Sequence, residues 1–357
     1  MPMRQPHVCR PQTVGYSTLC GIIGAWCRGE FPRWQIVDEE EWEGTVAQSR
    51  LHGVSGLVYK LLPDSAPAHI RESLQSDYNT QLAGNMLYIH QLTQIVPALR
   101  NASVRFAVVK GAALLATVYP EPAIRAMKDI DLLVHPEDAN ILRSVMMHLG
   151  WQEEDEDIAG RQFGERYRAE TSYTRQEGAL LLRVEAHLDM PGFYPPSRSA
   201  IWDRLTLVSG AGNDEMPVLS LSAHLSYLCA HYYYHHCGFG LKWLMDVALL
   251  ISRVTSWHDV VVDAYQFGTT RPVHLALHDV AKYLQVPVPQ HIVETLRFLP
   301  MPLSLRLLFE LCKRPGLQHY LGIRLLDIYR APNWRVRFGY IWRKLTAPRW
   351  RRRPQRG

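Results

Sequence analysis

The chain has 357 residues, of which 47% are hydrophobic and 20% charged. This balance argues against a disordered chain and is typical of a globular protein with room for two or three domains. The formal net charge is +5, but nine basic residues and no acidic one lie between Trp334 and Gly357, so the remainder carries about −4. Six cysteines form no CxxC pair, which argues against a disulfide framework or a thiolate zinc site and favours a reducing, cytoplasmic compartment.

The first hundred residues are predicted to be mostly helical. Residues 38–62 begin with acidic side chains suited to a helix N-terminus, and residues 68–102 carry apolar side chains at three- and four-residue spacing. The apolar stretch YSTLCGIIGAW is too short to cross a bilayer, which takes about 20 apolar residues. It also lacks a clear cleavage site, so neither a transmembrane segment nor a signal peptide is predicted.

The pattern changes in the middle of the chain, where short β-branched runs alternate with helix-prone segments. The order predicted is strand, helix, strand, helix, strand, strand, which gives a small mixed β-sheet with helices packed on it. Helical patterns return from about residue 217. We therefore expect an α+β fold with a helical N-terminal region at 1–100, an α/β core at 101–215, a helical domain at 216–333 and a basic tail at 334–357.

Two carboxylates interrupt the strand candidate DIDLLV. Because strand side chains alternate between faces, Asp129 and Asp131 point one way while Ile130 points toward the core. The same parity puts Glu185 on the charged face of the later strand LLLRVEAHLDM. If the two strands are neighbours, three carboxylates converge, and their repulsion calls for a divalent cation such as Mg²⁺ or Mn²⁺. An isolated D-x-D more often marks an exposed strand end, and that alternative stays open.

Upstream of the carboxylates, Lys110 and Gly111 fall where a strand ends and a helix begins. Free backbone N–H groups at such a turn favour a phosphate, glycine permits close approach, and the lysine adds a positive charge. The alternative is an ordinary strand-to-helix turn. Together with the acidic residues, the turn favours binding of a nucleoside triphosphate.

Residues 103–250 resemble the bacterial uncharacterised nucleotidyltransferase family of the DNA polymerase beta-like superfamily. The resemblance rests on KGAALLATVYPEPAIRAMKDIDLLV, RVEAHLDM and LSLSAHLSYLCAHYYYHHCGFGLKWLMDVA. It implies a nucleotidyltransferase core in which Asp129, Asp131 and Glu185 bind metal and act in catalysis. It also implies that Lys110 and Gly111 hold the triphosphate. In the wider superfamily a second small residue, Gly or Ser, follows the glycine, whereas this chain has Ala112, which removes a hydroxyl contact.

Two further residues of this pattern have open roles. Arg125 matches an arginine of the family and is predicted to bind the nucleotide by neutralising the triphosphate, while a salt bridge that fixes its loop is the alternative. His187 is predicted to position Glu185 or bind substrate, with a structural hydrogen bond as the alternative.

The segment SAHLSYLCAHYYYHHCGF places His224, His231 and His235 on one helical face. His231 and His235 have the spacing of a metal-binding pair, but the HExxH glutamate is missing, so a packed, hydrogen-bonded face is favoured. Lys242 and Asp246 in the following segment face the cleft or lock two helices together.

The sequence thus predicts an ATP- or other NTP-binding, metal-dependent nucleotidyltransferase. It would transfer a nucleoside monophosphate to a hydroxyl acceptor, such as a small molecule, peptide or protein, and release pyrophosphate. One alternative is a catalytically degenerate nucleotide- or partner-binding protein of the same fold, for which Ala112 is the main support. The other is nucleic-acid binding through the basic tail, where arginines alternate with Trp and Tyr, although a solvated terminus is the commoner role of such a segment.

Overall fold

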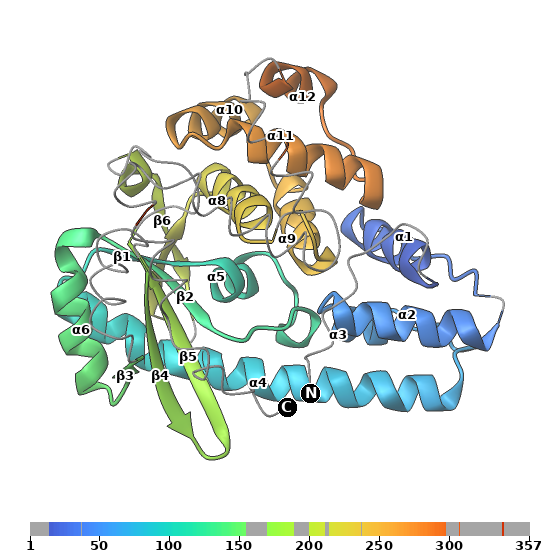
Figure 1. The fold of residues 1–357 in the computed structure, drawn as a ribbon, viewed down its shortest axis with the longest axis horizontal. Helices are drawn as coiled ribbons and strands as arrows, with labels where there is room; N and C mark the ends of the chain where they lie inside the picture. The colour runs from blue at the N-terminus through green and yellow to red at the C-terminus, as the bar shows by residue number, and fades with distance from the viewer. Residues whose placement is uncertain are drawn as a thin grey trace.

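The fold is a mixed seven-stranded sheet covered by helices on both faces (Figure 1). The computed structural model describes residues 14–36, 38–154, 170–188, 200–210, 214–236 and 238–297, together with 307 and 338. The strand order is β3-β4-β5-β2-β1-β7-β6. The strands are β1 Phe106–Val109, β2 Ile130–Val134, β3 Gln152–Glu153, β4 Glu170–Glu177, β5 Leu180–His187, β6 Leu205–Ser209 and β7 Glu215–Leu219.

Helices precede, interrupt and follow the sheet in the chain. Before it come α1 Tyr16–Cys27, α2 Glu39–Leu51, α3 Ser55–Lys60 and α4 Ala68–Asn101. Within it lie α5 Lys110–Thr117 and α6 Ala139–His148. After it come α8 Leu221–Tyr234, α9 Leu241–Ile251, α10 Trp257–Gln266, α11 Thr270–Asp279, a π-helical turn Val280–Leu284 and α12 Gln290–Arg297.

The central strands set the geometry of the sheet. β1 runs antiparallel to β2 and parallel to β7, while β2 runs parallel to β5. All five residues of β2 are buried, because the strand has a neighbour on each side and helices above and below. A polar side chain in this strand is therefore forced into the protein interior.

The two faces of the sheet are covered by different helices. On one face, Ile130 and Leu132 pack in an apolar cluster with side chains of α4 and α6. On the other, Val109 and Leu133 pack against Tyr227 of α8. By strand parity, Asp131 lies on the second face, beside α8 and α9.

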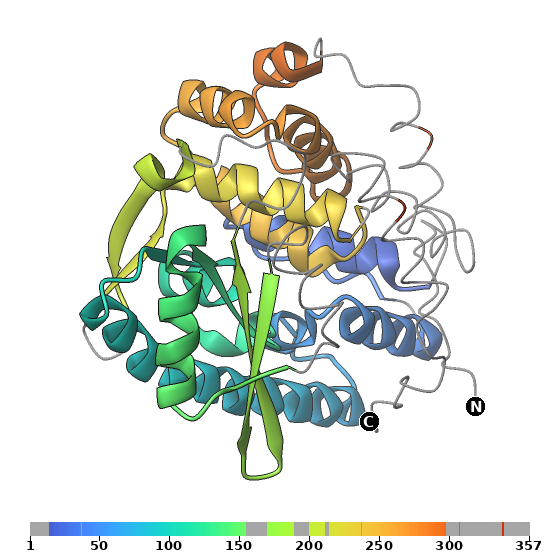
Figure 2. The ribbon, with the colours of Figure 1, turned by 60° about the vertical axis from the view of Figure 1, so that its left-hand side comes forward.

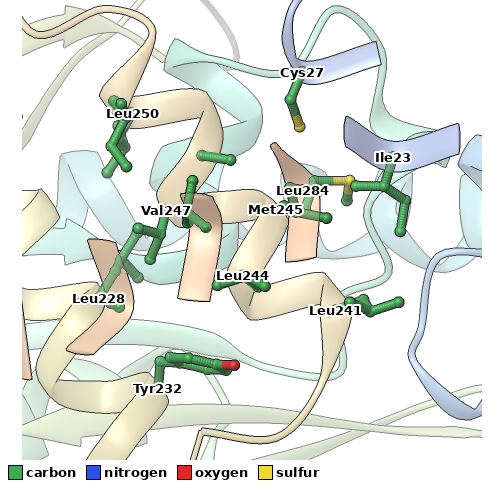
Figure 3. Close-up of a cluster of buried hydrophobic side chains, with 14 of the residues drawn as sticks. Ile23, Cys27, Leu228, Tyr232, Leu241, Leu244, Met245, Val247, Leu250 and Leu284 are labelled. Carbon is green, nitrogen blue, oxygen red and sulfur yellow. The ribbon is translucent and has the colours of Figure 1, made fainter. Parts of the chain in front are cut away.

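The helices at the beginning and end of the described chain share one core. Ile23 and Cys27 of α1 pack with Leu244 and Met245 of α9 and with Leu284 of the π-helical turn (Figure 3). Figure 2 shows the blue helices α1 to α3 beside the yellow and orange helices α8 to α11. The two helical regions, which the sheet separates in the sequence, therefore meet in space and enclose one end of the sheet.

The predicted α+β fold, a mixed sheet with helices packed on it, is confirmed. The sheet is larger than predicted, because the residue patterns of β3, β6 and β7 did not indicate strands. Residues 38–62 form two helices, α2 and α3, since Gly53 takes a φ of +68° between them. The domain boundaries stay a prediction, and the basic tail lies outside the described residues apart from Phe338.

The shared core gives a test of the packing. Replacing Leu244, which is 1% exposed, by alanine should lower the free energy of unfolding by about 2–5 kcal/mol, because the cavity cannot fully close. Leu249→Ala, at a partly buried site on the same helix, is the matched control and should lower the free energy of unfolding by less. Urea unfolding followed by circular dichroism measures both, and equal losses would contradict the packing.

Candidate active site

The turn between β1 and α5 is shaped by close contacts. Lys110 has a φ of +51°, in the left-handed region that non-glycine residues seldom adopt, and its backbone N–H donates to Nε2 of His224 at 3.2 Å. A Cβ on Gly111 would lie 2.4 Å from Nη1 of Arg125. The glycine is therefore required by the packed guanidinium beside it, and the turn is held in one conformation.

The predicted neighbour relation between the two acidic strands is present. In the parallel pair of β2 and β5, Asp131 is in register with Glu185, and Leu133 with His187. One ligand atom from each of Asp131, Glu185 and His187 lies within 4.8 Å of the others. Among the described residues, these three side chains form a group that could hold a metal ion. The group contains Asp131 and Glu185, two of the three carboxylates predicted from the sequence to converge.

Lys110 closes this group from the adjacent strand end. Its Nζ lies 2.6 Å from Oδ1 of Asp131 and 3.1 Å from Nε2 of His187, and that same Nε2 lies 2.9 Å from Oδ1. All three side chains are buried. Burial alone would raise the pKa of Asp131, but the charge of Lys110 and the hydrogen bond from His187 hold it well below its ordinary value. Asp131 is therefore a permanent carboxylate.

Asp129 occupies a different position from the one predicted. Because β2 begins at Ile130, Asp129 lies one residue before the strand. Its side chain is partly buried. Burial, and then the charge of Asp131, raise the pKa of Asp129. Asp129 lines the same cavity as the group around Asp131, while His187 joins that group instead.

Arg125 is buried in an ion pair with Asp246 of α9. Its Nε and Nη2 each donate to a carboxylate oxygen at 2.8 Å, and the hydroxyl of Tyr119 donates to the same carboxylate at 2.6 Å. Burial would lower the pKa of Arg125, but the charge of Asp246 outweighs it and raises that pKa. This pair ties the loop before β2 to α9, so Asp246 joins a loop to a helix rather than two helices to each other.

The long helix α4 supplies residues that the sequence analysis missed. The side-chain amide of Asn85 donates to the backbone carbonyls of Pro122 and Arg125 at 2.6 Å each, and its oxygen accepts from Met127 at 3.0 Å. The hydroxyl of Tyr88 donates to the carbonyl of Lys128. These bonds fix the loop that ends in Asp129. The sequence feature that could have identified Asn85 is an asparagine among otherwise apolar residues on the buried face of a helix.

A cavity of about 730 Å³ opens beside these groups. Its lining includes the acidic group and Lys110, together with His231, His235, His236, Lys242 and Trp243 from α8, α9 and the turn between them, and with Arg50, His52, Gly53 and Asp77 from the N-terminal helices. The cavity thus lies where the sheet edge meets both helical regions.

The predicted histidine face has a packing role. His224 binds the backbone of Lys110, and the rings of His231 and His235 stack with centroids 5.0 Å apart. Burial lowers the pKa of His224 to about 4 and holds that of His231 well below its ordinary value, so both are neutral. These contacts agree with the packed alternative that the sequence favoured.

A family model described as an uncharacterised nucleotidyltransferase matches residues 38–285. The chain belongs to this uncharacterised nucleotidyltransferase family. As a nucleotidyltransferase, the protein is an enzyme that transfers a nucleoside monophosphate, which confirms the predicted family and the predicted class of reaction. The matched range contains α2 to α11 and every residue of the candidate site.

Solved nucleotidyltransferase structures resemble parts of the chain. The antibiotic-resistance factor ANT(2'')-Ia in solution shares 16% identity over 54% of this chain and 97% of its own, with a TM-score of 0.35. An antigenic nucleotidyltransferase-like protein from Paracoccidioides brasiliensis shares 15% sequence identity over 56% of this chain and 94% of its own, with a TM-score of 0.35. ANT(2'')-Ia in complex with adenylyl-2''-tobramycin shares 15% sequence identity over 50% of this chain and 96% of its own, with a TM-score of 0.32. No curated protein matches the chain. Because these TM-scores are low, the family assignment rests on the family model.

In the described part of the nucleotidyltransferase, no helix is both long and apolar enough to span a membrane.

The buried ion pair gives a stability test. Asp246→Ala should lower the free energy of unfolding by about 3–5 kcal/mol, because it leaves the Arg125 guanidinium buried and unpaired. The double variant Arg125→Met/Asp246→Leu should recover most of that loss, since it removes both charges. Chemical unfolding measures the three proteins. A double variant as unstable as Asp246→Ala would show that the penalty does not come from an unpaired arginine.

His52 gives a test of pH dependence. Its Nδ1 accepts from the N–H of Leu241 at the start of α9, and burial lowers its pKa to about 4. The folded pKa lies below the unfolded value of about 6.5, so the stabilising contribution is complete above pH 6.5 and is lost as the pH falls toward 4. The loss attributable to His52 should be roughly 2 kcal/mol at pH 5.

Urea unfolding at pH 7 and pH 5 measures this loss. The His52→Gln variant, which keeps an acceptor but does not titrate, should lose less stability between the two pH values than the wild type. The same loss in both proteins would rule out His52 as the titrating group.

Proposed function

We propose that this nucleotidyltransferase is metal-dependent, and that it moves a nucleoside monophosphate from a nucleoside triphosphate to an acceptor hydroxyl with release of pyrophosphate. The observation that carries the proposal is the convergence of Asp131, Glu185 and His187 within 4.8 Å, next to the Lys110–Gly111 turn in a large cavity. Acids beside a phosphate-binding turn are the parts that phosphoryl transfer requires.

The donor set fits a hard divalent cation, Mg²⁺ or Mn²⁺. Asp131 and Glu185 offer carboxylate oxygens, Asp129 adds a third at the cavity wall, and such oxygens are the ligands these ions prefer. The ammonium of Lys110 already lies against Asp131, which shows that the site accommodates positive charge. When bound, the cation would neutralise the triphosphate and polarise its α-phosphate.

At the phosphate end, Lys110, the amide of Gly111 and Arg125 would hold the triphosphate. Asp246 occupies Nε and Nη2 of Arg125, while Nη1 lies beside Gly111. Arg125 would thus combine its two predicted roles, with the salt bridge to Asp246 holding the guanidinium and Nη1 left beside the turn for a phosphate oxygen. Ala112 packs in the apolar cluster on one face of the sheet and does not line the cavity. The absence of a hydroxyl at this position is therefore weak support for a degenerate site.

The acceptor oxygen would form a bond to the α-phosphorus while the bond to the β-phosphate breaks, and pyrophosphate leaves. The proton of the acceptor hydroxyl would pass to Glu185, whose side chain is 21% exposed at the cavity, the most open of the three. His187, with Nε2 3.9 Å from Glu185, would keep that carboxylate in place. The acceptor would be a small molecule, peptide or protein, and ATP is one of four candidate donors.

The test is calorimetric titration of ATP, GTP, CTP and UTP, with and without Mg²⁺ or Mn²⁺. Wild type should bind at least one of them in a metal-dependent manner. Asp131→Asn and Glu185→Gln should each lower metal-dependent affinity at least tenfold, because each removes a ligand charge. Glu177→Gln, on β4 and paired with Arg175 away from the cavity, is the matched control and should bind normally.

Two results would count against the proposal. The first is metal-independent binding that survives both substitutions, which would favour a nucleotide-binding protein without transfer activity. The second is a wild type that binds none of the four triphosphates.

A further inference from the structure

One cation of the cavity has no role in the site described so far. Lys242, the second residue of α9, lines the same cavity as Lys110 and Gly111 but belongs to a different element. It is partly buried, and its stem lies over Gly53, where an added Cβ would lie 3.4 Å from the lysine Cδ. Its Nζ lies 4.8 Å from the centroid of the Trp243 ring.

Lys242 differs from the other buried cations of this cavity in lacking a carboxylate partner. Lys110 pairs with Asp131, and Arg125 with Asp246. Among the residues that the structure describes, no carboxylate oxygen lies within 4.0 Å of Nζ of Lys242. Lys128, the remaining lysine of the cavity, is exposed and hydrated.

An ammonium that is stripped of water without a counter-charge is costly. Burial, followed by the charge of Arg125, lowers the pKa of Lys242 to about 8. Asp129 and Asp246 act in the opposite direction but do not offset this. A bound anion would replace the lost hydration and supply the missing charge.

The surroundings hold Lys242 in place. Gly240 has a φ of +106°, and a Cβ there would lie 2.3 Å from the Trp243 ring, so the turn before α9 fixes the indole closely. The indole stacks with the His236 ring, whose centroid lies 3.4 Å away at an interplanar angle of 16°, and the centroid of the His231 ring lies 6.5 Å away. The first two backbone N–H groups of α9, those of Leu241 and Lys242, donate to Nδ1 and to the carbonyl oxygen of His52, which fixes the start of the helix.

We propose that Lys242 is an oxyanion-binding residue on the α9 wall of the cavity, separate from the Lys110–Gly111 turn, and that its ligand is a phosphate group. This inference rests on the proposed function for the source of that group. It belongs either to the triphosphate tail of the donor nucleotide or to a phosphorylated acceptor, and both offer the same oxygen atoms to the ammonium.

The first experiment uses inorganic tripolyphosphate as the probe, titrated calorimetrically without metal. Lys242→Met, which keeps an apolar stem, should weaken binding about 10- to 100-fold relative to wild type, the range expected for one charge-assisted hydrogen bond. Lys242→Arg should retain most of the affinity. Lys282→Met is the matched control, since Nζ of Lys282 lies 5.0 Å from the ring of the following Tyr283 but outside the cavity, and it should bind like wild type.

A second pair of titrations separates the two sources. Loss of ATP affinity in Lys242→Met with AMP affinity unchanged assigns the residue to the triphosphate tail. The other outcome assigns Lys242 to the acceptor. In that case Lys242→Met binds ATP as tightly as wild type, but inorganic phosphate no longer binds to the variant saturated with a non-hydrolysable ATP analogue. Either result supports the proposal.

The proposal is overturned if wild type does not bind tripolyphosphate, or if Lys242→Met binds it as tightly as Lys282→Met does. Thermal unfolding of each variant confirms that it is folded. Because the first probe needs neither metal nor nucleoside, its result is independent of the tests on Asp131 and Glu185. The proposed function and this inference can therefore fail separately.

Discussion

The buried ion pair between Arg125 and Asp246 is the interaction on which the arrangement of the site depends. Both side chains are almost fully shielded from water, so neither charge is tolerable without the other. The pair joins the loop before β2 to α9, and the same guanidinium fills the space beside Gly111. One contact therefore fixes the Lys110–Gly111 turn, the strand that carries Asp131 and helix α9 relative to one another.

Around this anchor, the protein compensates most of its buried charge internally. Lys110 meets Asp131 across adjacent strand ends, and His187 joins them through a nitrogen that lies near both. Such compensation keeps Asp131 ionised in the interior, as ligation of a cation requires. Lys242 is the exception among the buried cations of the cavity, and this is why it points to an anionic ligand.

The cavity also bears on which acceptors are plausible. The lining contributed by α8, α9 and the turn between them consists of imidazoles, an indole and Lys242, whereas Asp129, Asp131 and Glu185 lie at the sheet and Asp77 of α4 pairs with Arg50. This distribution favours an acceptor that is neutral or anionic where it contacts that lining, because a strongly cationic group there would be repelled by Lys242.

The sequence by itself determined the alternating pattern of DIDLLV and RVEAHL, the glycine turn and the class of fold, because strand parity and turn chemistry are local properties. It therefore identified Asp129, Asp131 and Glu185 as carboxylates that converge, and Lys110 as a residue of the turn upstream of them. Only the tertiary structure decided which groups surround them. Asn85 and Asp246 reach the site from distant helices, His187 enters the ligand group in place of Asp129, and Arg125 meets its partner 121 residues away. Such contacts depend on how helices pack across the sheet, and no local pattern encodes that packing.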